Sequence, residues 1–412
     1  MSFRSLLLFP FLACAASAWA GSLSFSVEGS ADYALKHNPT LAAARLRIEE
    51  GRGRLQQSGR LSNPELELDF TRNARGPEGS AGIGLTQRFP LTSRLRHDKA
   101  VSRAELAVAE AEVGDAERKL CAEVRSVAMK LLALAGQREL RTKQLGNSRE
   151  LLSLLLKRVQ SGEASAVDAS QVELESRQIE LESLMLAADE AVLLGDLRPL
   201  LGIASDDRVH ISGELPVPKA IPAAREITGR PDILAAESRA EAARSLVLGQ
   251  HARRWEDFGI GASYTRERVL DAPEPVGTDQ LIGVRFTFSL PLWNNNAGRI
   301  REAETASARA AKEVEATKLG ANAEVTAALG AMRAYANLIS ELDDKVLPTA
   351  MRIEDQLRNS FSAGQTPLTD VLRARTRRLE LQRQRLNALL DYQLARIRHS
   401  AATSPVPSHS FK

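Results

Sequence analysis

The residues that most often carry chemistry are dispersed along this chain. No two histidines are spaced i, i+4 and none has a cysteine partner, so no zinc site is indicated; the six are His37, His97, His210, His251, His399 and His409. The sequence has neither a phosphate-cradling Gly-x-x-x-x-Gly-Lys-Ser/Thr loop nor a Gly-x-Ser-x-Gly nucleophile elbow. Its many carboxylates fall on periodic helical segments, where they are typical of solvated faces. We therefore expect no enzyme activity, no bound metal and no cofactor.

Composition argues against two further classes. The formal net charge is +3 for the full chain, which is too small for a nucleic-acid partner. Beyond residue 20 the sequence has no uninterrupted apolar run of ~18 residues, so we expect no transmembrane helix. Cys121 is the only cysteine apart from Cys14, and Cys14 lies in a predicted export signal, so no intramolecular disulfide is expected.

Two glycine turns with matching neighbours are the most distinctive local signals. One spans residues 161–168 and the other residues 363–370. Each glycine can take the left-handed conformation that ends a helix. Each is followed by a helix-start signal, Ser165 in the first turn and Thr366 with Pro367 at the first helical position in the second. Two hairpins with equivalent tips predict an internal duplication.

Long helical patterns must position these turns. Residues 91–162 contain no proline, and apolar residues recur at three- and four-residue steps, as at Leu120, Val124, Val127 and Leu131. This spacing predicts a helix with one apolar stripe, roughly 100 Å long at about 1.5 Å per residue. A second run of similar length covers residues 292–364. Such rods favour a protein that bridges two distant places.

Four short segments alternate between apolar and polar residues, as strands do. They are residues 65–71, 82–89, 258–265 and 281–290. Each is close to the ~9–11 residues that cross a bilayer as a tilted strand. Four strands cannot close a barrel and an open edge is not tolerated in lipid, whereas three copies supply twelve strands. The alternative is a half-buried sheet of a soluble protein.

The predicted fold is mainly α with a membrane β part, organised as two repeats. The expected parts are a signal peptide at 1–20, a first repeat at 21–202 (hairpin 64–89, helical hairpin 92–200), a connector at 203–229, a second repeat at 230–399 (hairpin 257–290, helical hairpin 297–399) and a disordered tail at 400–412. The signal has a basic start, an apolar core and an Ala-Trp-Ala cleavage site. Lipidation of Cys14 is the alternative to plain cleavage after Ala20.

The order of these features resembles the TolC-type outer-membrane efflux factors. The resemblance rests on Asn38-Pro39-Thr40-Leu41, Asn63-Pro64-Glu65-Leu66, Gln87-Arg88-Phe89-Pro90-Leu91 and Gly364 through Asp370-Val371-Leu372. It covers essentially the whole chain after residue 20. The Asn-Pro-Glu-Leu strand entry is most similar to the CzcC-like branch, which serves heavy-metal cation efflux.

The resemblance implies a homotrimer in the outer membrane of a Gram-negative bacterium. Its twelve-stranded β-barrel continues into a twelve-helix α-barrel across the periplasm. The helical tips dock on a periplasmic adaptor, which is joined to an inner-membrane pump of the resistance-nodulation-division kind. In such a tube the chain is a passive conduit.

The resemblance also implies roles for individual residues. The adaptor-docking positions are Gly162, Glu163, Ala164, Ser165, Gly364, Gln365, Thr366 and Pro367. Asp370 matches an acidic residue that forms a ring at the periplasmic aperture, where carboxylates attract cations and hold the entrance shut. Arg373 stands where some members carry a second acidic residue, so it either pairs with Asp370 or indicates a different gate. Trp255 and Trp293 flank the second strand pair, where interfacial aromatics are expected.

Other interpretations stay open at this point. The tips could be no more than well-formed turns, and Asp370 could simply complement a helix N-terminus. A periplasmic coiled-coil adaptor explains the hairpins without a pore, and an exported enzyme would need a convergent polar site that the sequence lacks. Within the channel class, drugs or a secreted protein are the alternative cargo.

Overall fold

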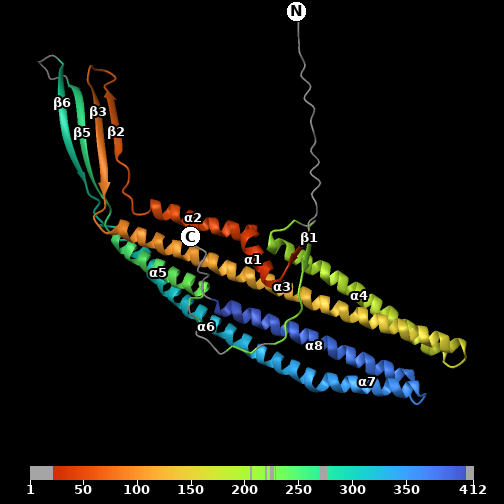
Figure 1. The fold of residues 1–412 in the computed structure, drawn as a ribbon. Coiled ribbons are helices and arrows are strands. Elements are labelled where there is room, and N and C mark those ends of the chain that lie inside the picture. The colour runs from red at the N-terminus through yellow and green to blue at the C-terminus, as the bar shows by residue number, and fades with distance from the viewer. Residues whose placement is uncertain are drawn as a thin grey trace, which may run out of the picture. The chain divides into compact units, whose positions relative to one another are not determined.

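The computed structural model describes residues 22–204, 207–218, 220–222, 227, 229–269 and 276–404. The predicted signal peptide with Cys14, and residues 405–412 of the predicted tail, lie outside the described residues. Helices dominate the fold (Figure 1). No helix in the described part of the chain is both long and apolar enough to span a membrane.

The elements in chain order are β1 (Ser22–Phe25), α1 (Val27–His37), α2 (Pro39–Gln57), β2 (Glu65–Arg72), β3 (Gly79–Phe89), α3 (Arg94–Gln160), α4 (Ala166–Leu201), β4 (Arg208–Ile211), α5 (Pro231–Ala252), β5 (Phe258–Val269), β6 (Gly277–Thr287), α6 (Ala297–Glu341), a π-helical turn (Leu342–Val346), α7 (Leu347–Ser362) and α8 (Leu368–Thr403).

The long helix predicted before the first glycine turn is present as α3. It is unbroken over 67 residues, which makes it about 100 Å long at 1.5 Å per residue. Its return helix α4 has 36 residues and ends at Gly202, which takes the left-handed conformation with φ 69°. The helical content expected from the apolar periodicity is therefore confirmed.

The second long run differs from the expectation of one continuous helix. A five-residue π-helical turn separates α6 from α7. Pro348 follows this turn, and a proline has no N–H for the helical ladder and crowds the carbonyl four residues earlier. The preceding turn therefore widens. Asp343 in that turn accepts hydrogen bonds of 2.5 and 2.9 Å from Arg385 of α8, which ties the distorted segment to its neighbour.

Both predicted strand hairpins are present and join into one antiparallel sheet. Its order is β2-β3-β5-β6, and β3 pairs with β5 from Gly79 opposite Arg268 to Phe89 opposite Phe258. The inner strands are thus one from each hairpin, and β2 and β6 are the edges. The expectation of a mainly helical chain with an antiparallel β part is confirmed.

A two-stranded parallel sheet, β1 with β4, was not predicted from the sequence. Leu23 lies opposite Val209 and Phe25 opposite Ile211. The sequence indicates only an irregular connector over residues 203–229, because four-residue strands are too short for alternation to stand out. The pairing fastens the start of the described chain to this connector. At the other end, α8 continues through Thr403, past the expected helix end at residue 399.

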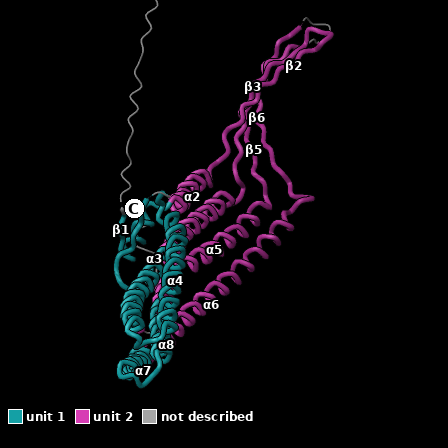
Figure 2. The backbone as a smooth tube through the Cα atoms, turned by 90° about the vertical axis from the view of Figure 1, so that its right-hand side faces the viewer, with its two compact units in different colours: residues 1–38, 123–217, 342–390 teal, residues 39–122, 218–341, 391–412 magenta. Residues whose placement is uncertain are grey.

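The chain forms two compact units, shown in separate colours in Figure 2. Unit 1 comprises residues 1–38, 123–217 and 342–390, and unit 2 comprises residues 39–122, 218–341 and 391–412. Unit 1 contains both glycine turns. Unit 2 contains the four-stranded sheet, which extends beyond the ends of α2, α5 and α6 (Figure 2).

In unit 1, the Asn38 side chain closes the end of α4. The last carbonyls of a helix have no partner within the helix. The Asn38 amide donates to the carbonyl oxygen of Leu200 at 2.9 Å and lies 3.4 Å from that of Pro199. Leu197 and Leu201 of the same helix end are fully buried. Asn38 therefore serves α4 as well as the break between α1 and α2.

In unit 2, Arg230 precedes α5 and binds this helix to α6. Its buried guanidinium lies 2.8 Å from Asp232 and 2.7 Å from Glu324 of α6. A second bridge joins α2 to α3, with Arg45 2.8 Å from the buried Glu117. These pairs hold the helices that carry the sheet.

Candidate functional site

Both glycine turns end their helices with the same hydrogen-bond pattern. At the first, Gly162 N–H donates to the Val159 carbonyl at 3.1 Å and Glu163 N–H to the Arg158 carbonyl at 2.8 Å. At the second, Gly364 N–H and Gln365 N–H donate to the corresponding carbonyls of α7 at 3.0 and 2.9 Å. This is the Schellman arrangement, which needs a left-handed residue at the glycine position. The φ angles are 76° at Gly162 and 73° at Gly364.

The two turns belong to one hydrophobic cluster in unit 1. Buried Leu155, Ala169 and Val172 from the first hairpin pack with Leu368 from the second. Partly buried side chains surround them: Leu151, Leu152, Val159, Ala164, Phe361 and Leu372. The structure therefore brings the two predicted tips together.

Not all eight predicted tip residues are equally available to a partner. Six are exposed, namely Gly162, Glu163, Ser165, Gly364, Gln365 and Pro367. Ala164 and Thr366 are half-buried, Ala164 against the cluster. The exposed set is thus small and mostly polar, with its backbone fixed by the two caps.

The start of α8 differs in detail from the predicted cap. Helix α8 begins at Leu368, one residue after Pro367. The Thr366 hydroxyl donates to the Leu357 carbonyl of α7 at 3.5 Å instead of capping α8. Thr366 therefore connects the two arms of its own hairpin. Ser165, by contrast, does cap α4, since its side chain accepts from the Val167 N–H at 3.1 Å.

Asp370 and Arg373 form an ion pair on the first turn of α8. The Arg373 guanidinium donates to the Asp370 carboxylate at 3.2 Å. The side chains are 38% and 81% exposed, so water screens the pair and its contribution to stability is below about 1 kcal/mol. Within this chain Arg373 is therefore an ion-pair partner of Asp370.

A buried polar cluster in unit 1, missed by sequence reasoning, joins α3, α4 and α8. Arg375 of α8 is buried and donates to the Gln144 carbonyl of α3 at 3.1 Å. Glu175 of α4 faces Arg375 and the buried Ser148, and burial raises the pKa of the Glu175 carboxyl against the opposing effects of these two partners. A signal was present in the sequence, because Arg375 falls in the helical register of buried Leu368, Val371 and Leu379.

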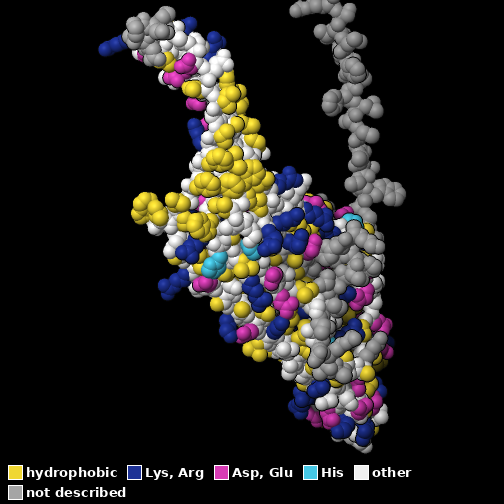
Figure 3. All heavy atoms as spheres, turned by 90° about the vertical axis from the view of Figure 1, so that its left-hand side faces the viewer, with side chains coloured by type: hydrophobic (Ala, Val, Ile, Leu, Met, Phe, Trp, Pro, Cys, Tyr) yellow, Lys and Arg dark blue, Asp and Glu magenta, His cyan; other side chains and the backbone are white. Residues whose placement is uncertain are grey.

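One face of the four-stranded sheet is apolar and open to solvent in a single chain. Side chains alternate between the two faces along a strand, and the pairing register places one set together. We call this set the apolar face: Leu66, Leu68, Phe70, Ala81, Ile83, Leu85, Phe89, Phe258, Ile260, Ala262, Tyr264, Ile282, Val284 and Phe286. Figure 3 shows it as a continuous hydrophobic surface over the strands. Ile282 is 85% and Phe70 79% exposed, and an exposed apolar surface of this extent is typical of a membrane or protein interface.

The opposite face, which we call the polar face, is made mostly of glycine, serine, threonine and charged residues. Its charged residues are Glu65, Glu67, Asp69, Arg88, Glu267, Asp279 and Arg285, and the strand residues Val269 and Leu281 are its apolar exceptions. The sequence showed the alternation of each strand, but only the register reveals that carboxylates outnumber guanidinium groups on one surface.

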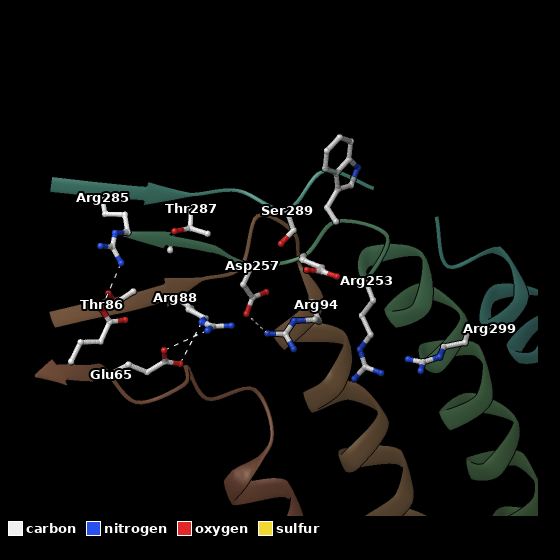
Figure 4. Close-up of a pocket in the computed structure, with 14 residues that line it drawn as sticks. Glu65, Thr86, Arg88, Arg94, Arg253, Asp257, Arg285, Thr287, Ser289 and Arg299 are labelled. Carbon is white, nitrogen blue, oxygen red and sulfur yellow. Dashed lines mark hydrogen bonds and ion pairs between the residues drawn. The ribbon is translucent and has the colours of Figure 1, made fainter. Parts of the chain in front are cut away.

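At the helix end of the polar face lies a charged hollow of about 460 Å³ (Figure 4). Arg88 lies 3.4 Å from Glu65 and Arg285 lies 3.6 Å from Glu67. Arg94 at the start of α3 lies 2.6 Å from Asp257. Nearly all the charges in the hollow come from side chains on the sheet and the adjoining helix ends. This arrangement can attract and order ions but holds no nucleophile paired with a base.

Trp255 and Trp293 lie beside the second strand pair, as the sequence indicates. Trp255 is 47% and Trp293 95% exposed. At the same end of the sheet, Phe258 packs against Phe89 and Phe288, with ring centroids 5.8 Å apart in each pair. Aromatic side chains therefore gather where the strands meet the helices.

Comparison with known proteins identifies the family. The family described as "Outer membrane efflux protein" matches residues 31–202 and 224–403. The chain belongs to the outer membrane efflux protein family. Proteins of this family are channels, so the chain is an outer membrane efflux channel and not an enzyme. Among the described residues, no group of three or more histidine, cysteine or carboxylate side chains is placed to hold a metal ion.

Solved structures of similar fold include several outer membrane channels. The structure of CusC, described in relation to transmembrane channel formation, is 16% identical with a TM-score of 0.78, over 92% of each chain. VceC from Vibrio cholerae is 21% identical with a TM-score of 0.74, over 92% of this chain and 97% of VceC. The open-state MtrE channel from Neisseria gonorrhoeae is 16% identical with a TM-score of 0.73, over 92% of this chain and 89% of MtrE. No curated protein sequence matches significantly.

Proposed function

We propose that three copies of this chain form one passive channel across the outer membrane and periplasm, which conducts heavy-metal cations delivered by a resistance-nodulation-division pump through a periplasmic adaptor. The observation that carries this proposal is the sheet. It has one apolar face, one charged face and, within the described residues, two unpaired edges.

The unpaired edges require other copies of the chain. In lipid every backbone N–H and C=O must find a partner, and only helices and closed barrels satisfy this. The edges β2 and β6 are each paired on one side only in the described structure. Three copies, each joining its β6 to the β2 of the next, give twelve strands, within the range of bacterial barrels.

The helices support the same assembly. Helix α4 carries an exposed apolar stripe with largely heptad spacing, made of Val167, Leu174, Leu181, Met185 and Val192, each 62–71% exposed. Such a stripe is the seam of a coiled coil. In the proposed trimer it packs against helices of the neighbouring copy, so that twelve helices close a tube around a wet lumen.

Cation cargo is supported by the charge of the polar face, which lines the lumen in the proposed barrel. Each chain places five carboxylates there against two guanidinium groups, Arg88 and Arg285, and both of these lie beside carboxylates. A pore lined by one sign of charge concentrates ions of the opposite sign. Drug efflux or protein secretion is the alternative cargo within this class.

The proposed docking surface for the adaptor is the pair of tips. Their backbone is fixed by two Schellman caps, and their shared cluster sets their spacing. A rigid surface loses little entropy on binding. Asp370, with Arg373, is the proposed gate at the aperture, and Trp255 and Trp293 are the proposed anchors at the membrane interface.

Cell fractionation and a resistance panel test this proposal. The expected product is a heat-modifiable trimer that is found in the outer membrane and needs detergent for extraction. A strain lacking the protein should lose resistance to zinc, cobalt, cadmium or copper while its tolerance of dyes is unchanged. Lost dye tolerance with normal metal resistance would favour drug efflux, and a water-soluble monomer would favour a periplasmic scaffold.

A further inference from the structure

Three arginines end the apolar face of the sheet at the edge farthest from the helices of unit 2. Arg72 and Arg268 lie in one row across the strands, on either side of Gly79, and Arg266 lies in the next row opposite Ala81. All three side chains are exposed. We call them the rim arginines. Figure 3 shows Lys and Arg side chains at this end of the strands, where the hydrophobic surface stops.

The rim arginines surround a shallow hollow. A cavity of about 670 Å³ is lined by all three, by Gly79 and Ala81, and by two carboxylate residues, Glu78 and Glu267. Strands lie about 4.8 Å apart, so Arg72 and Arg268 flank Gly79 at roughly 10 Å across. Gly79 and Ala81 of β3, which lies between β2 and β5, have little or no side chain and leave the bottom of the hollow open. Long arginine side chains on both walls can therefore reach one group in the middle, and guanidinium groups bind phosphate oxygens in paired fashion.

The rim arginines have no carboxylate partners among the described residues. The arginines of the polar face behave differently, since Arg88 and Arg285 each lie beside a glutamate. Glu267, between Arg266 and Arg268 in sequence, points to the polar face because side chains alternate along a strand. Glu78 also lines the hollow, but its carboxylate accepts a hydrogen bond from the Asn73 side chain at 2.7 Å. Within the described residues no ion pair joins a rim arginine to Glu78 or Glu267, so the three guanidinium groups can bind an anion from outside the chain.

The distance along the strand matches the thickness of a membrane. From the aromatic row at Phe258 to Arg266 and Arg268, β5 runs about 27–34 Å at 3.4 Å per residue. Tilted by about 40°, as barrel strands are, this gives roughly 20–26 Å along the barrel axis, compared with about 25 Å for the apolar band of such barrels. The rim arginines thus lie at the level where lipid headgroups begin, in the leaflet away from the helices.

We propose that the rim arginines form a binding site for the phosphate groups of an anionic glycolipid of the lipid A class in the outer leaflet. This inference rests on the proposed function, because it needs the apolar face to lie in the membrane. Each trimer carries three such sites. The lipid phosphate lies over Gly79 and Ala81, held by guanidinium groups from β2 and β5, while its acyl chains cover the apolar face below.

Native mass spectrometry of the detergent-solubilised trimer tests this site directly. The probes are diphosphorylated lipid A, the same lipid without its phosphates, and phosphatidylglycerol. We expect the trimer to retain diphosphorylated lipid A in preference to both others. The triple variant Arg72→Gln, Arg266→Gln, Arg268→Gln should bind it about tenfold more weakly or worse, because charge-assisted contacts are lost.

A second triple variant with the same change in charge is the control. Arg47, Arg103 and Arg301 are exposed helical arginines outside the sheet, and their replacement by glutamine should leave lipid A retention unchanged. Equal retention by the rim variant, or equal retention of the dephosphorylated lipid or of phosphatidylglycerol, overturns the proposal. The comparison of lipids on the unchanged protein decides the matter even where the rim variant does not assemble. A normal conducting trimer that shows no phosphate-dependent retention of lipid A contradicts this inference alone. Absence of any membrane trimer contradicts the proposed function.

Discussion

At the scale of single residues, the backbone conformation of the two tip glycines restricts their substitution more than the space around them does. A Cβ added at Gly162 or Gly364 would meet no atom within 4 Å. Both residues nevertheless have positive φ, which costs other residues about 1 kcal/mol or more. The tips are therefore sensitive to substitution through the backbone.

Two glycine substitutions with opposite expected effects on the free energy of unfolding test this. We expect Gly162→Ala to lower the free energy of unfolding by about 1 kcal/mol, because alanine resists the left-handed conformation. Gly146→Ala, in the interior of α3 with open space around it, should raise it by up to about 1 kcal/mol. Thermal denaturation in detergent compares the two. Equal shifts of the same sign would show that the cap is unimportant.

The buried carboxyl of Glu175 predicts a pH dependence. Burial raises its pKa above the ordinary value of 4.5, so the folded protein holds this proton more tightly than the unfolded chain. Stability contributed at low pH is then lost as the pH rises from 4.5 through the raised pKa. Relative to Glu175→Gln, the wild type should lose melting temperature as the pH rises through that window.

Glu139→Gln is the control, because the pH dependence of stability expected for Glu139 is opposite to that of Glu175. A hydrogen bond from Lys143 lowers the pKa of Glu139. The wild type should therefore gain stability relative to this variant as the pH rises through the ordinary glutamate range. Parallel pH profiles for wild type and Glu175→Gln would contradict the assignment of a buried, proton-retaining carboxyl.

Asp370 gives the residue-scale test of the gate. We expect Asp370→Ala to raise the conductance of reconstituted trimers and to lower their preference for cations, because a ring of carboxylates is removed from the aperture. Planar-bilayer recording measures both quantities, and Arg373→Ala reports whether the ion pair with Asp370 contributes. Unchanged conductance and selectivity in Asp370→Ala would rule out the gate.

At the scale of elements, the sequence predicted those elements whose pattern lies within one continuous segment of the chain. The glycine turns, strand hairpins and α3 each carry their signal within a short segment, through a left-handed glycine, alternation or apolar periodicity. The pairing of β1 with β4 and the cluster of Glu175 with Arg375 depend on contacts between distant segments. The π-helical turn was not predicted, because apolar periodicity does not reveal the effect of Pro348 on the preceding turn. For the candidate site, the sequence predicted the two glycine turns. The hydrogen bond from Thr366 back to α7 and the ion pair of Arg373 with Asp370 became visible only in the structure.

The prediction for the two tips concerns their docking to the adaptor. We expect Gly162→Pro or Gly364→Asp to abolish resistance while trimers still reach the outer membrane, because only the turn between two helices is deformed. Resistance assays, with immunoblots of unheated outer membranes, measure the two properties separately. Normal efflux with both changes present would exclude the tips as the adaptor contact.

At the scale of the whole molecule, the central claim is that neighbouring copies close one barrel through their β2 and β6 edges. One chain exposes a lipid-compatible face but leaves both edges unpaired in the described structure. The roles proposed for the apolar face, the polar face, the rim arginines and the gate all depend on that closure. The claim is therefore tested at the edges.

Disulfide cross-linking in outer membranes measures this closure most directly. In a Cys121→Ala background, a cysteine at Asp69 on β2 is combined in turn with one at Leu281, Gly283 or Arg285 on β6, and with one at Ser263 on the inner strand β5 as control. The account predicts that at least one β2–β6 pair gives a ladder of cross-linked products ending at the trimer, while the Ser263 pair gives no intermolecular product. Monomeric products from every β2–β6 pair, or a ladder that continues beyond three chains, would contradict it.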